Sequence, residues 1–366
     1  MSLYLDYNAT APLRPVALAA FEQAYAHTGN ASSVHAAGRQ ARALVEDGRQ
    51  RIARAAGFSP AELIFTSGGT ESNHLALTGL KVAARLTSRI EHESVLKNSA
   101  HAQRLPVTAD GLVDLTAARA LIAAAKRPAL VSVMWVNNET GVIQPIARLL
   151  EICREYGAYL HVDAVQALGR VALDVPVDLL TLSAHKVGGP LGVGALLVRA
   201  PLDVEPLLCG GGQERGRRAG TENVPAIHAF AAAVEAALAD LPELQRRAAW
   251  RDAFEQRLLQ VPGTVIIGQA APRVANTSCF ALPGFKSELQ LMQLDLKGVA
   301  VSSGSACSSG KVTRSHVLTA MGLPAEVCNS VLRVSFGWKT AESELISCAE
   351  IWTELANSVI RKASGA

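Results

Sequence analysis

The sequence predicts an α/β fold with a mostly parallel central sheet, accompanied by a smaller α+β domain. Strand-like and helix-like segments alternate through the first two-thirds of the 366 residues. The run Ala129–Val136 is almost continuously apolar, as expected for a strand that is covered on both faces. The chain is 49% hydrophobic, which is enough for a large core or for two domains.

Each element of the first part is predicted from its own pattern. Leu63–Thr66 is a short apolar strand that ends at a glycine turn, and helical spacing of apolar residues follows from Glu71 to Arg85. Gly157 ends one amphipathic helix, and Pro242 ends a long alanine-rich one. The other predicted elements are strands at 159–163, 178–182 and 194–198 and helices at 146–156, 221–239 and 243–259.

The second part has shorter strands. They are predicted at 265–267, 277–280, 299–302 and 332–336, and a helix from Glu342 to about Lys362 closes the chain. We therefore predict a large domain at 14–249 and a small domain at 250–366, with residues 1–13 packed on the small domain.

Composition narrows the classes of partner. A net charge of +3 is too small to indicate a nucleic-acid or membrane partner, and no window approaches the length of a membrane span. The six cysteines form no CxxC pair and no zinc-like cluster, so neither a metal site nor a disulfide framework is predicted. The N-terminus lacks the features of a targeting peptide, and a reducing, cytoplasmic location is expected.

The most informative residues are a lysine and an acid that follow neighbouring predicted strands. Lys186 lies where the run 178–182 meets a glycine turn, and Asp163 lies in the strand that begins at Tyr159. Pyridoxal phosphate (PLP) requires a lysine that links it covalently and a carboxylate that keeps its pyridine nitrogen protonated. Lys186 alone is better explained as a surface lysine, and Asp163 as a core acid satisfied by a hydrogen bond. Their combination with the motifs below favours a PLP site.

A phosphate-binding turn is expected between the strand at Leu63–Thr66 and the next helix. Gly69 and Thr70 lie there, where glycines allow a tight turn and free N–H groups at the helix start attract an anion. The same residues also form a reasonable helix cap. Ser183 and His185 flank Lys186 and could add phosphate donors.

Three further side chains are candidates for contacts with the ring. Asn138 follows the strand 129–136, at the edge where α/β proteins bind ligands, and Gln166 lies three residues after Asp163. Either could bind the phenolic oxygen of PLP, although Asn138 could equally belong to an ordinary turn. His92 could stack on the ring and move protons, but composition alone favours a solvated histidine between two acids.

Two residues of the second part could act on a substrate. Cys307 lies in a small, polar, glycine-containing run with little apolar sequence beside it, so an accessible and reactive thiol is expected. Arg333 lies among apolar residues of a predicted strand. It is either part of an edge-strand ion pair or a bidentate clamp for a substrate carboxylate.

Taken together, these motifs closely resemble those of the cysteine desulfurases of the NifS/IscS type. That family lies within the class V aminotransferase group of fold-type I, aspartate-aminotransferase-like PLP enzymes. The resemblance runs from Tyr4 to about Phe336. The matching motifs are Tyr4–Thr10, Thr66–Asn73, Glu91–Leu96, Asn137–Gly141, His161–Gln166, Ser183–Lys186, Gln213–Thr221 and Ser302–Cys307.

The resemblance implies a role for each candidate. Lys186 is similar to the PLP-linking lysine, Asp163 to the partner of the ring nitrogen, His92 to the stacked histidine and Cys307 to the cysteine that forms a persulfide. The residues similar to the other cofactor ligands are Gly69, Thr70, Asn138, Gln166, Ser183, His185 and Thr221, with Thr221 supplied by the second subunit of a homodimer. Those similar to the substrate-binding residues are Asn30, Asn138 and Arg333.

The resemblance implies conversion of L-cysteine to L-alanine, with sulfur passed from Cys307 to an acceptor protein in iron–sulfur cluster assembly or thiolation. The chain departs from the family pattern after Cys307, where Lys311–Arg314 replaces a common Leu-Glu-Pro run, and it ends early. These departures concern the acceptor more than the chemistry. The alternatives are a selenocysteine lyase, another PLP lyase or aminotransferase, and a non-catalytic partner in iron–sulfur assembly.

Overall fold

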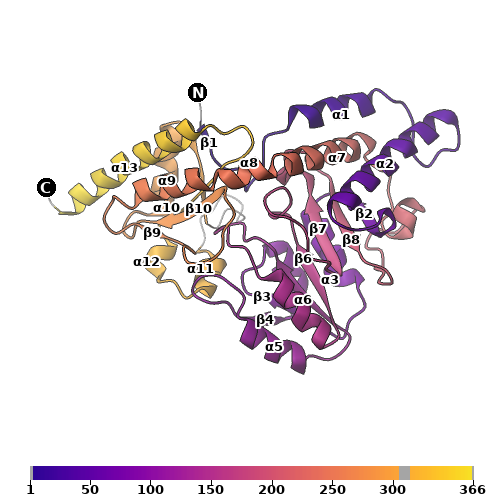
Figure 1. The fold of residues 1–366 in the computed structure, drawn as a ribbon, viewed down its shortest axis with the longest axis horizontal. Coiled ribbons are helices and arrows are strands. Elements are labelled where there is room, and N and C mark those ends of the chain that lie inside the picture. Colours follow the sequence, from indigo (N-terminus) through magenta and orange to yellow (C-terminus); the bar gives the residue numbers. More distant parts are fainter. Residues whose placement is uncertain (1–2, 305–313, 365–366) are drawn as a thin grey trace.

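A computed structural model describes residues 3–304 and 314–364 (Figure 1). The larger sheet has seven strands in the order β2-β8-β7-β6-β5-β3-β4. They are β2 (Leu63–Thr66), β3 (Ala84–Ser88), β4 (Gln103–Leu105), β5 (Ala129–Met134), β6 (Ala158–Asp163), β7 (Leu179–Ser183) and β8 (Gly194–Val198). β8 runs antiparallel to both of its neighbours, and the other pairs in this sheet are parallel. The predicted mostly parallel α/β sheet is confirmed.

Helices cover both faces of this sheet. Successive residues of a strand point to opposite faces, and both faces carry apolar side chains that must be buried. Leu130 packs with residues of α3, whereas Val131 belongs to the cluster that holds α2, α6 and α7. The helices of this part are α1 (Pro15–Tyr25), α2 (Ala36–Ala55), α3 (Gly69–Gly79), α4 (Glu93–Leu96), α5 (Leu115–Ala124), α6 (Ile146–Glu155) and α7 (Val224–Ala239). Short 3-10 turns are η1 (Pro60–Glu62), η2 (Lys97–Ser99), η3 (Ala184–Lys186) and η4 (Gln213–Gly216).

A second sheet lies beside the first and is antiparallel, in the order β12-β13-β10-β9. Its strands are β9 (Val265–Ile266), β10 (Thr277–Ala281), β12 (Ser302–Ser303) and β13 (Val331–Ser335), while β1 (Leu3–Tyr4) pairs in parallel with β11 (Val299–Ala300). The helices here are α8 (Leu241–Arg246), α9 (Ala248–Leu258), α10 (Ser287–Leu296), α11 (His316–Ala320), α12 (Ala325–Cys328) and α13 (Glu342–Ser364).

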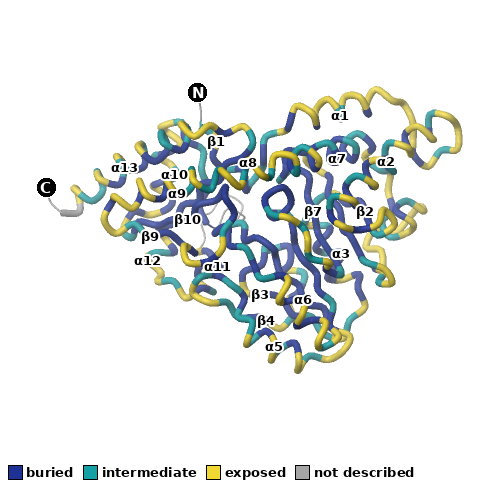
Figure 2. Tube along the Cα trace, in the orientation of Figure 1, coloured by how far each residue is buried: buried dark blue, intermediate teal, exposed yellow. Residues whose placement is uncertain are grey.

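The second sheet has its own core, in which the aromatic rings of Phe280 and Trp352 meet edge to face. Leu5 from the N-terminus belongs to the same cluster, which brings the start of the chain onto this part. Figure 2 shows buried strands in both sheets and exposed outer surfaces on α1 and α13. The division at 249/250 stays a prediction.

Three predicted elements need correction. The helix expected from Glu71 to Arg85 ends at Gly79, and β3 follows at Ala84–Ser88. The helical spacing of apolar residues continues past Gly79 in the sequence, but α3 ends there. The backbone of Glu205 lies so close to Gly79 that a Cβ on this glycine would be 2.8 Å from the Glu205 carbonyl oxygen. The helix expected at 243–259 is divided into α8 and α9, and the strand expected at 299–302 is divided into β11 and β12.

Within residues 3–304 and 314–364, no single helix has both the length and the apolar character needed to span a membrane. One bent pair, Val224–Ala239 with Leu241–Leu258, meets the length and composition criteria when taken together.

Candidate active site

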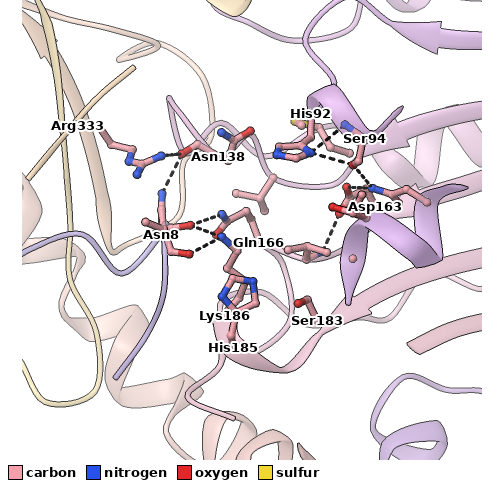
Figure 3. Close-up of a pocket in the computed structure, with 17 residues that line it drawn as sticks. Asn8, His92, Ser94, Asn138, Asp163, Gln166, Ser183, His185, Lys186 and Arg333 are labelled. Carbon is pink, nitrogen blue, oxygen red and sulfur yellow. Dashed lines mark hydrogen bonds between the residues drawn. The ribbon is translucent and has the colours of Figure 1, made fainter. Parts of the chain in front are cut away.

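A cavity of about 340 Å³ opens at the carboxyl ends of β6 and β7, beside the first turn of α3 (Figure 3). Its volume lies within the usual range for small-molecule sites. Most of the predicted ligand-binding residues meet there. The lining comprises Asn8, Ala9, Gly69, Thr70, Asn73, His92, Ser94, Met134, Val136, Asn138, Asp163, Val165, Gln166, Ser183, His185, Lys186 and Arg333.

Lys186 enters the cavity from η3, the turn that directly follows β7. Its Nζ donates to the backbone oxygens of Asn8 at 2.7 Å and Ala9 at 2.8 Å. The lysine side chain is therefore held at the cavity by the N-terminal segment.

Asp163 is the last residue of β6, which is parallel to β7, so the acid and the lysine reach the same edge of the sheet. Its carboxylate is buried and accepts hydrogen bonds from Asn73 Nδ2 at 2.7 Å and from the backbone N–H of Val165 at 3.0 Å. These two donors hold the carboxylate in one orientation. The acid is thus prepared to partner a cationic group in the cavity.

His92 caps α4 from the opposite side of the cavity. Its Nδ1 accepts from the backbone N–H of Ser94 at 3.1 Å and lies 2.8 Å from the Ser94 hydroxyl. Burial lowers the pKa of His92, and the charge of Lys186 acts in the same direction while Asp163 opposes it. Because Nδ1 accepts, the neutral ring carries its proton on Nε2.

One end of the cavity is suited to an anion. The first turn of α3 presents Gly69 and Thr70, and Ser183 lies at the end of β7. A Cβ on Gly69 would lie 2.8 Å from Val165 Cγ2, so any other residue here would force Val165 to shift. Burial lowers the pKa of His185 to about 4, helped by the charge of Lys186, and its ring contacts the Thr10 hydroxyl at 3.1 Å. His185 is therefore neutral near pH 7.

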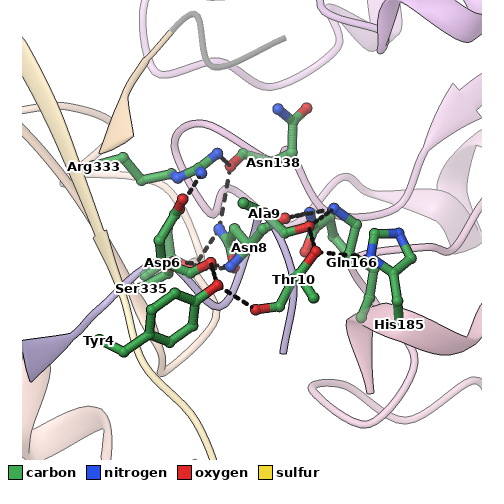
Figure 4. A network of polar contacts seen from close by, with 12 residues as sticks. Tyr4, Asp6, Asn8, Ala9, Thr10, Asn138, Gln166, His185, Arg333 and Ser335 are labelled. Carbon is green, nitrogen blue, oxygen red and sulfur yellow. Dashed lines mark hydrogen bonds and ion pairs between the residues drawn. The ribbon is translucent and has the colours of Figure 1, made fainter. Parts of the chain in front are cut away.

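The N-terminal segment supplies a polar centre that the sequence analysis did not identify (Figure 4). The Asn8 carbonyl accepts from Gln166 Nε2 at 2.9 Å, and the Asn8 side-chain oxygen accepts from Arg170 Nη1 at 2.9 Å. Arg170 also donates to Gln166 Oε1. Burial, reinforced by the charge of Arg333, lowers the pKa of Arg170 to about 9. Among the described residues, the Arg170 guanidinium donates to the amide oxygens of Asn8 and Gln166 and not to a carboxylate, which leaves positive charge beside the cavity.

Arg333 reaches the cavity from the second sheet. It lies on β13, an inner strand, and not on the edge strand that one reading of the sequence supposed. Its Nη2 forms an ion pair with Asp6 at 2.6 Å, and its Nη1 donates to the Asn138 backbone oxygen at 2.9 Å. The buried Nε of Arg333 has no hydrogen-bond partner in the described part of the chain.

Two of the predicted residues, Asn30 and Thr221, do not line this cavity. Asn30 is exposed, and its side chain accepts from the backbone N–H of Ser32 at 2.8 Å. Thr221 is exposed and lines a different hollow, near η4. Cys307 lies outside the described residues. The roles assigned to all three stay predictions.

Asn8, Asn73 and Ser94 lie in the cavity but were not predicted to be site residues. All three lie within motifs that carry the family resemblance, and for Asn73 the available signal was a polar residue one turn into a helix at the carboxyl edge of the sheet. No sequence pattern indicated that Asn8 meets Lys186, because the two residues are far apart along the chain.

The cavity fits PLP by the chemistry of its donors. Lys186 offers an amine for an aldehyde, Asp163 a carboxylate for a ring nitrogen, and the first turn of α3 with Ser183 offers donors to a phosphate. The glycine turn leaves room for an anion to approach the backbone. Among the described residues no group of three or more His, Cys, Asp and Glu side chains could hold a metal ion.

Comparison with known proteins identifies the family. The class-V aminotransferase family matches residues 3–346. The chain is 39% identical to the cysteine desulfurase IscS of Dictyoglomus turgidum over 362 residues, covering 94% of this chain and 91% of the relative. It is 39% identical to the IscS-like cysteine desulfurase of Mycobacterium tuberculosis over 371 residues, covering 95% and 94%.

Solved structures agree with the sequence relatives. The X-ray structure of a NifS-like protein from Rickettsia africae superimposes with a TM-score of 0.89 at 32% identity, covering 98% of this chain and 100% of the other. Another NifS-like protein gives a TM-score of 0.90 at 31% identity, with the same coverage. The fold predicted as fold-type I is thereby confirmed. The chain belongs to the cysteine desulfurases of the class-V aminotransferase family, which depend on PLP.

Proposed function

We propose that this protein is a PLP-dependent cysteine desulfurase that converts L-cysteine to L-alanine and forms a persulfide on Cys307. The observation that carries the proposal is that Lys186 and Asp163 enter one cavity from adjacent parallel strands, in a chain of this family. The comparisons do not favour a selenocysteine lyase, another lyase or a non-catalytic role.

PLP, when bound, supplies an electron sink that makes the α-proton of the substrate acidic and weakens the carbon–sulfur bond of the substrate. Lys186 would link the cofactor and then remove the α-proton at Nζ. Asp163 would hold a proton on the ring nitrogen, and Asn73 keeps that carboxylate oriented. His92, with its exchangeable proton on Nε2, would return a proton to the product.

Substrate orientation falls to the residues at the junction of the two sheets. Arg333 is a donor for the substrate carboxylate, and Asn138 lies next to it in the lining. Gln166 and Asn138 are donors for the phenolic oxygen of the cofactor. The Arg170 charge behind Gln166 favours an anion at that place.

In the sulfur step, the Cys307 thiolate attacks the sulfur of bound L-cysteine. A sulfur–sulfur bond forms, and the carbon–sulfur bond breaks with its electron pair left on the carbon skeleton, which then takes up protons to become alanine. One L-cysteine and one thiol thus yield one L-alanine and one persulfide, and no outside oxidant or reductant is needed.

The sulfur then passes to an acceptor protein, such as an iron–sulfur scaffold or a thiolation carrier. We also propose a homodimer in which Thr221, and Asn30 with it, serve the cavity of the partner subunit. Both residues are exposed and lie outside this chain's own cavity, as such a role requires. The five described cysteines are all free, which supports a reducing, cytoplasmic location.

The decisive experiment is mass spectrometry of the holoenzyme after incubation with L-cysteine, with alanine measured in parallel. We expect one additional sulfur on Cys307. Lys186→Ala should abolish turnover, because no other described amine lines the cavity. Cys307→Ser should bind PLP but form no persulfide. Release of alanine by Cys307→Ser at the wild-type rate would show that the proposed sulfur step is wrong.

A further inference from the structure

Arg170 is a buried cation beside the cavity that no carboxylate of the described residues balances. It is 6% exposed and lies in the segment after β6, four residues beyond Gln166. Its Nη1 donates to the Asn8 side-chain oxygen at 2.9 Å and to Gln166 Oε1. A buried charge is costly unless an opposite charge balances it. Its place next to a lining residue therefore favours an anion bound in the cavity.

Arg170 also determines which way the Gln166 amide faces. An arginine can only donate, so the Gln166 atom that it contacts is the oxygen. The NH2 group of Gln166 is then on the other side, where it donates to the Asn8 carbonyl oxygen at 2.9 Å. The same oxygen accepts from Lys186 Nζ at 2.7 Å. The donor end of Gln166 therefore lies beside the amine that would link the cofactor (Figure 4).

The phenolic oxygen of PLP matches this place. It is bonded to the ring carbon next to the one that bears the aldehyde, so it lies beside the nitrogen of a linked lysine. The oxygen and that nitrogen share one proton, and loss of this proton leaves a negative charge. A nearby cation stabilises that charge, and a hydrogen bond polarised by a cation strengthens the next one in series. Arg170 is therefore expected to lower the pH at which the proton is lost.

We propose that Arg170 is a positioning residue that turns the amide donor of Gln166 toward the phenolic oxygen of PLP and favours the ionised form of that oxygen. The proposal rests on the proposed function, which places Gln166 at this oxygen. Arg170 does not itself line the cavity, so it acts through Gln166. The consequence is that the linked cofactor can take a proton from the ammonium group of incoming L-cysteine, which must be neutral before its nitrogen can attack.

Other charged groups face the same place. Those that line the cavity are His92, Asp163, His185, Lys186 and Arg333, the last paired with Asp6. Those at a smaller hollow that Arg170 shares with Lys186 are Tyr7 and Arg14, the latter paired with Asp240. All of them are the same in every variant at position 170, so a difference between such variants reports the side chain at that position.

The test follows the absorbance of the bound cofactor in the substrate-free holoenzyme between about pH 5.5 and 8, where Arg170 keeps its charge. Arg170→Met removes the charge and the donors, Arg170→Gln keeps a donor without the charge, and Arg170→Lys keeps both. Lysine is a fair replacement because both hydrogen bonds of Arg170 come from one nitrogen. If Arg170→Met does not fold, the comparison of Arg170→Gln with Arg170→Lys decides the question.

We expect the midpoint of the titration to rise by about 0.5–1 pH unit in Arg170→Met and Arg170→Gln. An opposite charge within about 4–6 Å shifts a pKa by about 1–3 units, and Arg170 acts through an intervening amide. Arg170→Lys should stay within about 0.2 unit of the wild type. Arg85→Met is the matched control, because Arg85 donates to the backbone oxygens of Leu77 and Leu80 and lies near the amino ends of the strands, away from the cavity. It should leave the midpoint unaltered.

A second measurement uses a cofactor analogue, 3-O-methyl PLP, which has no ionisable phenolic oxygen. Arg170→Met should weaken the binding of PLP about 10-fold and the binding of the analogue less than about twofold. Equal losses for the two ligands would overturn the inference, because Arg170 would then only support the shape of the cavity.

The titration also separates this inference from the proposed function. A midpoint shift below about 0.2 unit in both neutral variants, or an equally large shift in Arg170→Lys, would overturn the role of Arg170. A wild type that forms neither alanine nor persulfide from L-cysteine would overturn the desulfurase function. The titration would still decide the role of Arg170 in that case, since it requires only bound PLP.

Discussion

Asn73→Ala tests how the acid of the cavity is held. Asn73 is 1% exposed, and its Nδ2 donates to Asp163 Oδ2 at 2.7 Å and to the Ser94 hydroxyl at 2.9 Å. The backbone N–H of Val165 still donates to Asp163 in this variant. A hydrogen bond to a charged group contributes about 1.5–3 kcal/mol net, so the substitution should remove about that much stabilisation.

The lost stabilisation is divided between two equilibria, the unfolding of the apoprotein and the binding of PLP. Without PLP, the Asp163 carboxylate can turn toward water and recover part of the free energy, whereas with PLP bound it must hold one orientation. We therefore expect the loss in the free energy of unfolding of the apoprotein and the loss in PLP binding free energy to sum to about 1.5–3 kcal/mol. If all of it falls on cofactor binding, the dissociation constant of PLP rises about 10–150-fold.

The assay pairs urea unfolding of the apoprotein with a spectroscopic titration of PLP. Asn98→Ala is the matched control, because its Nδ2 donates to the Ser94 backbone oxygen at 2.8 Å and does not contact Asp163. A summed loss below about 0.5 kcal/mol in Asn73→Ala, or an equal loss of PLP affinity in both variants, would refute the reasoning.

Three further predictions follow from contacts at the site. Gly69→Ala should destabilise the protein by about 1–3 kcal/mol in thermal unfolding, because the new Cβ meets Val165 Cγ2 at 2.8 Å, and adding Val165→Ala should restore stability. Burial raises the pKa of Glu91 to about 8, so folded Glu91 keeps a proton that the unfolded chain loses above about pH 4.3. The stability that protonated Glu91 contributes is full below that pH and is lost as the pH rises toward 8. In urea unfolding at pH 6, 7 and 8, the free energy of unfolding of Glu91→Gln should rise relative to that of the wild type by up to about 1.4 kcal/mol per pH unit. The same pH dependence in both proteins would contradict this. Asp6→Asn removes the ion-pair partner of buried Arg333 and should lower the free energy of unfolding by about 3–5 kcal/mol, with a loss under about 1 kcal/mol counting against the pair.

The chemistry-bearing residues of the large sheet could be predicted because they are local to its strands. Lys186 and Asp163 each follow an apolar strand, and parallel strands bring their carboxyl ends to one edge. Gly69 and Thr70 likewise follow β2 at the start of a helix. For these positions the strand pattern and the direction of the chain are sufficient.

Residues whose partners come from distant segments could not be predicted in this way. Asn8 meets Lys186 and Gln166 only because the N-terminal strand β1 pairs with β11 and directs the following turn across the cavity. Arg333 was identified as a candidate site residue from its apolar neighbours in the sequence. Its ion-pair partner Asp6, however, lies 327 residues away along the chain. Such contacts leave no periodic trace in the sequence.

The sequence by itself determined the α/β class, the strand-end positions of the lysine and the acid, and the family, because these depend on local periodicity and on motifs with fixed spacing. Only the tertiary structure decided that Asn73 orients Asp163, that the N-terminal carbonyls hold Lys186, and that the buried carboxyl group of Glu139 accepts a hydrogen bond from Ser315. Hydrogen bonds act over about 3 Å, and the packing of two sheets, rather than distance along the chain, determines which polar groups approach that closely.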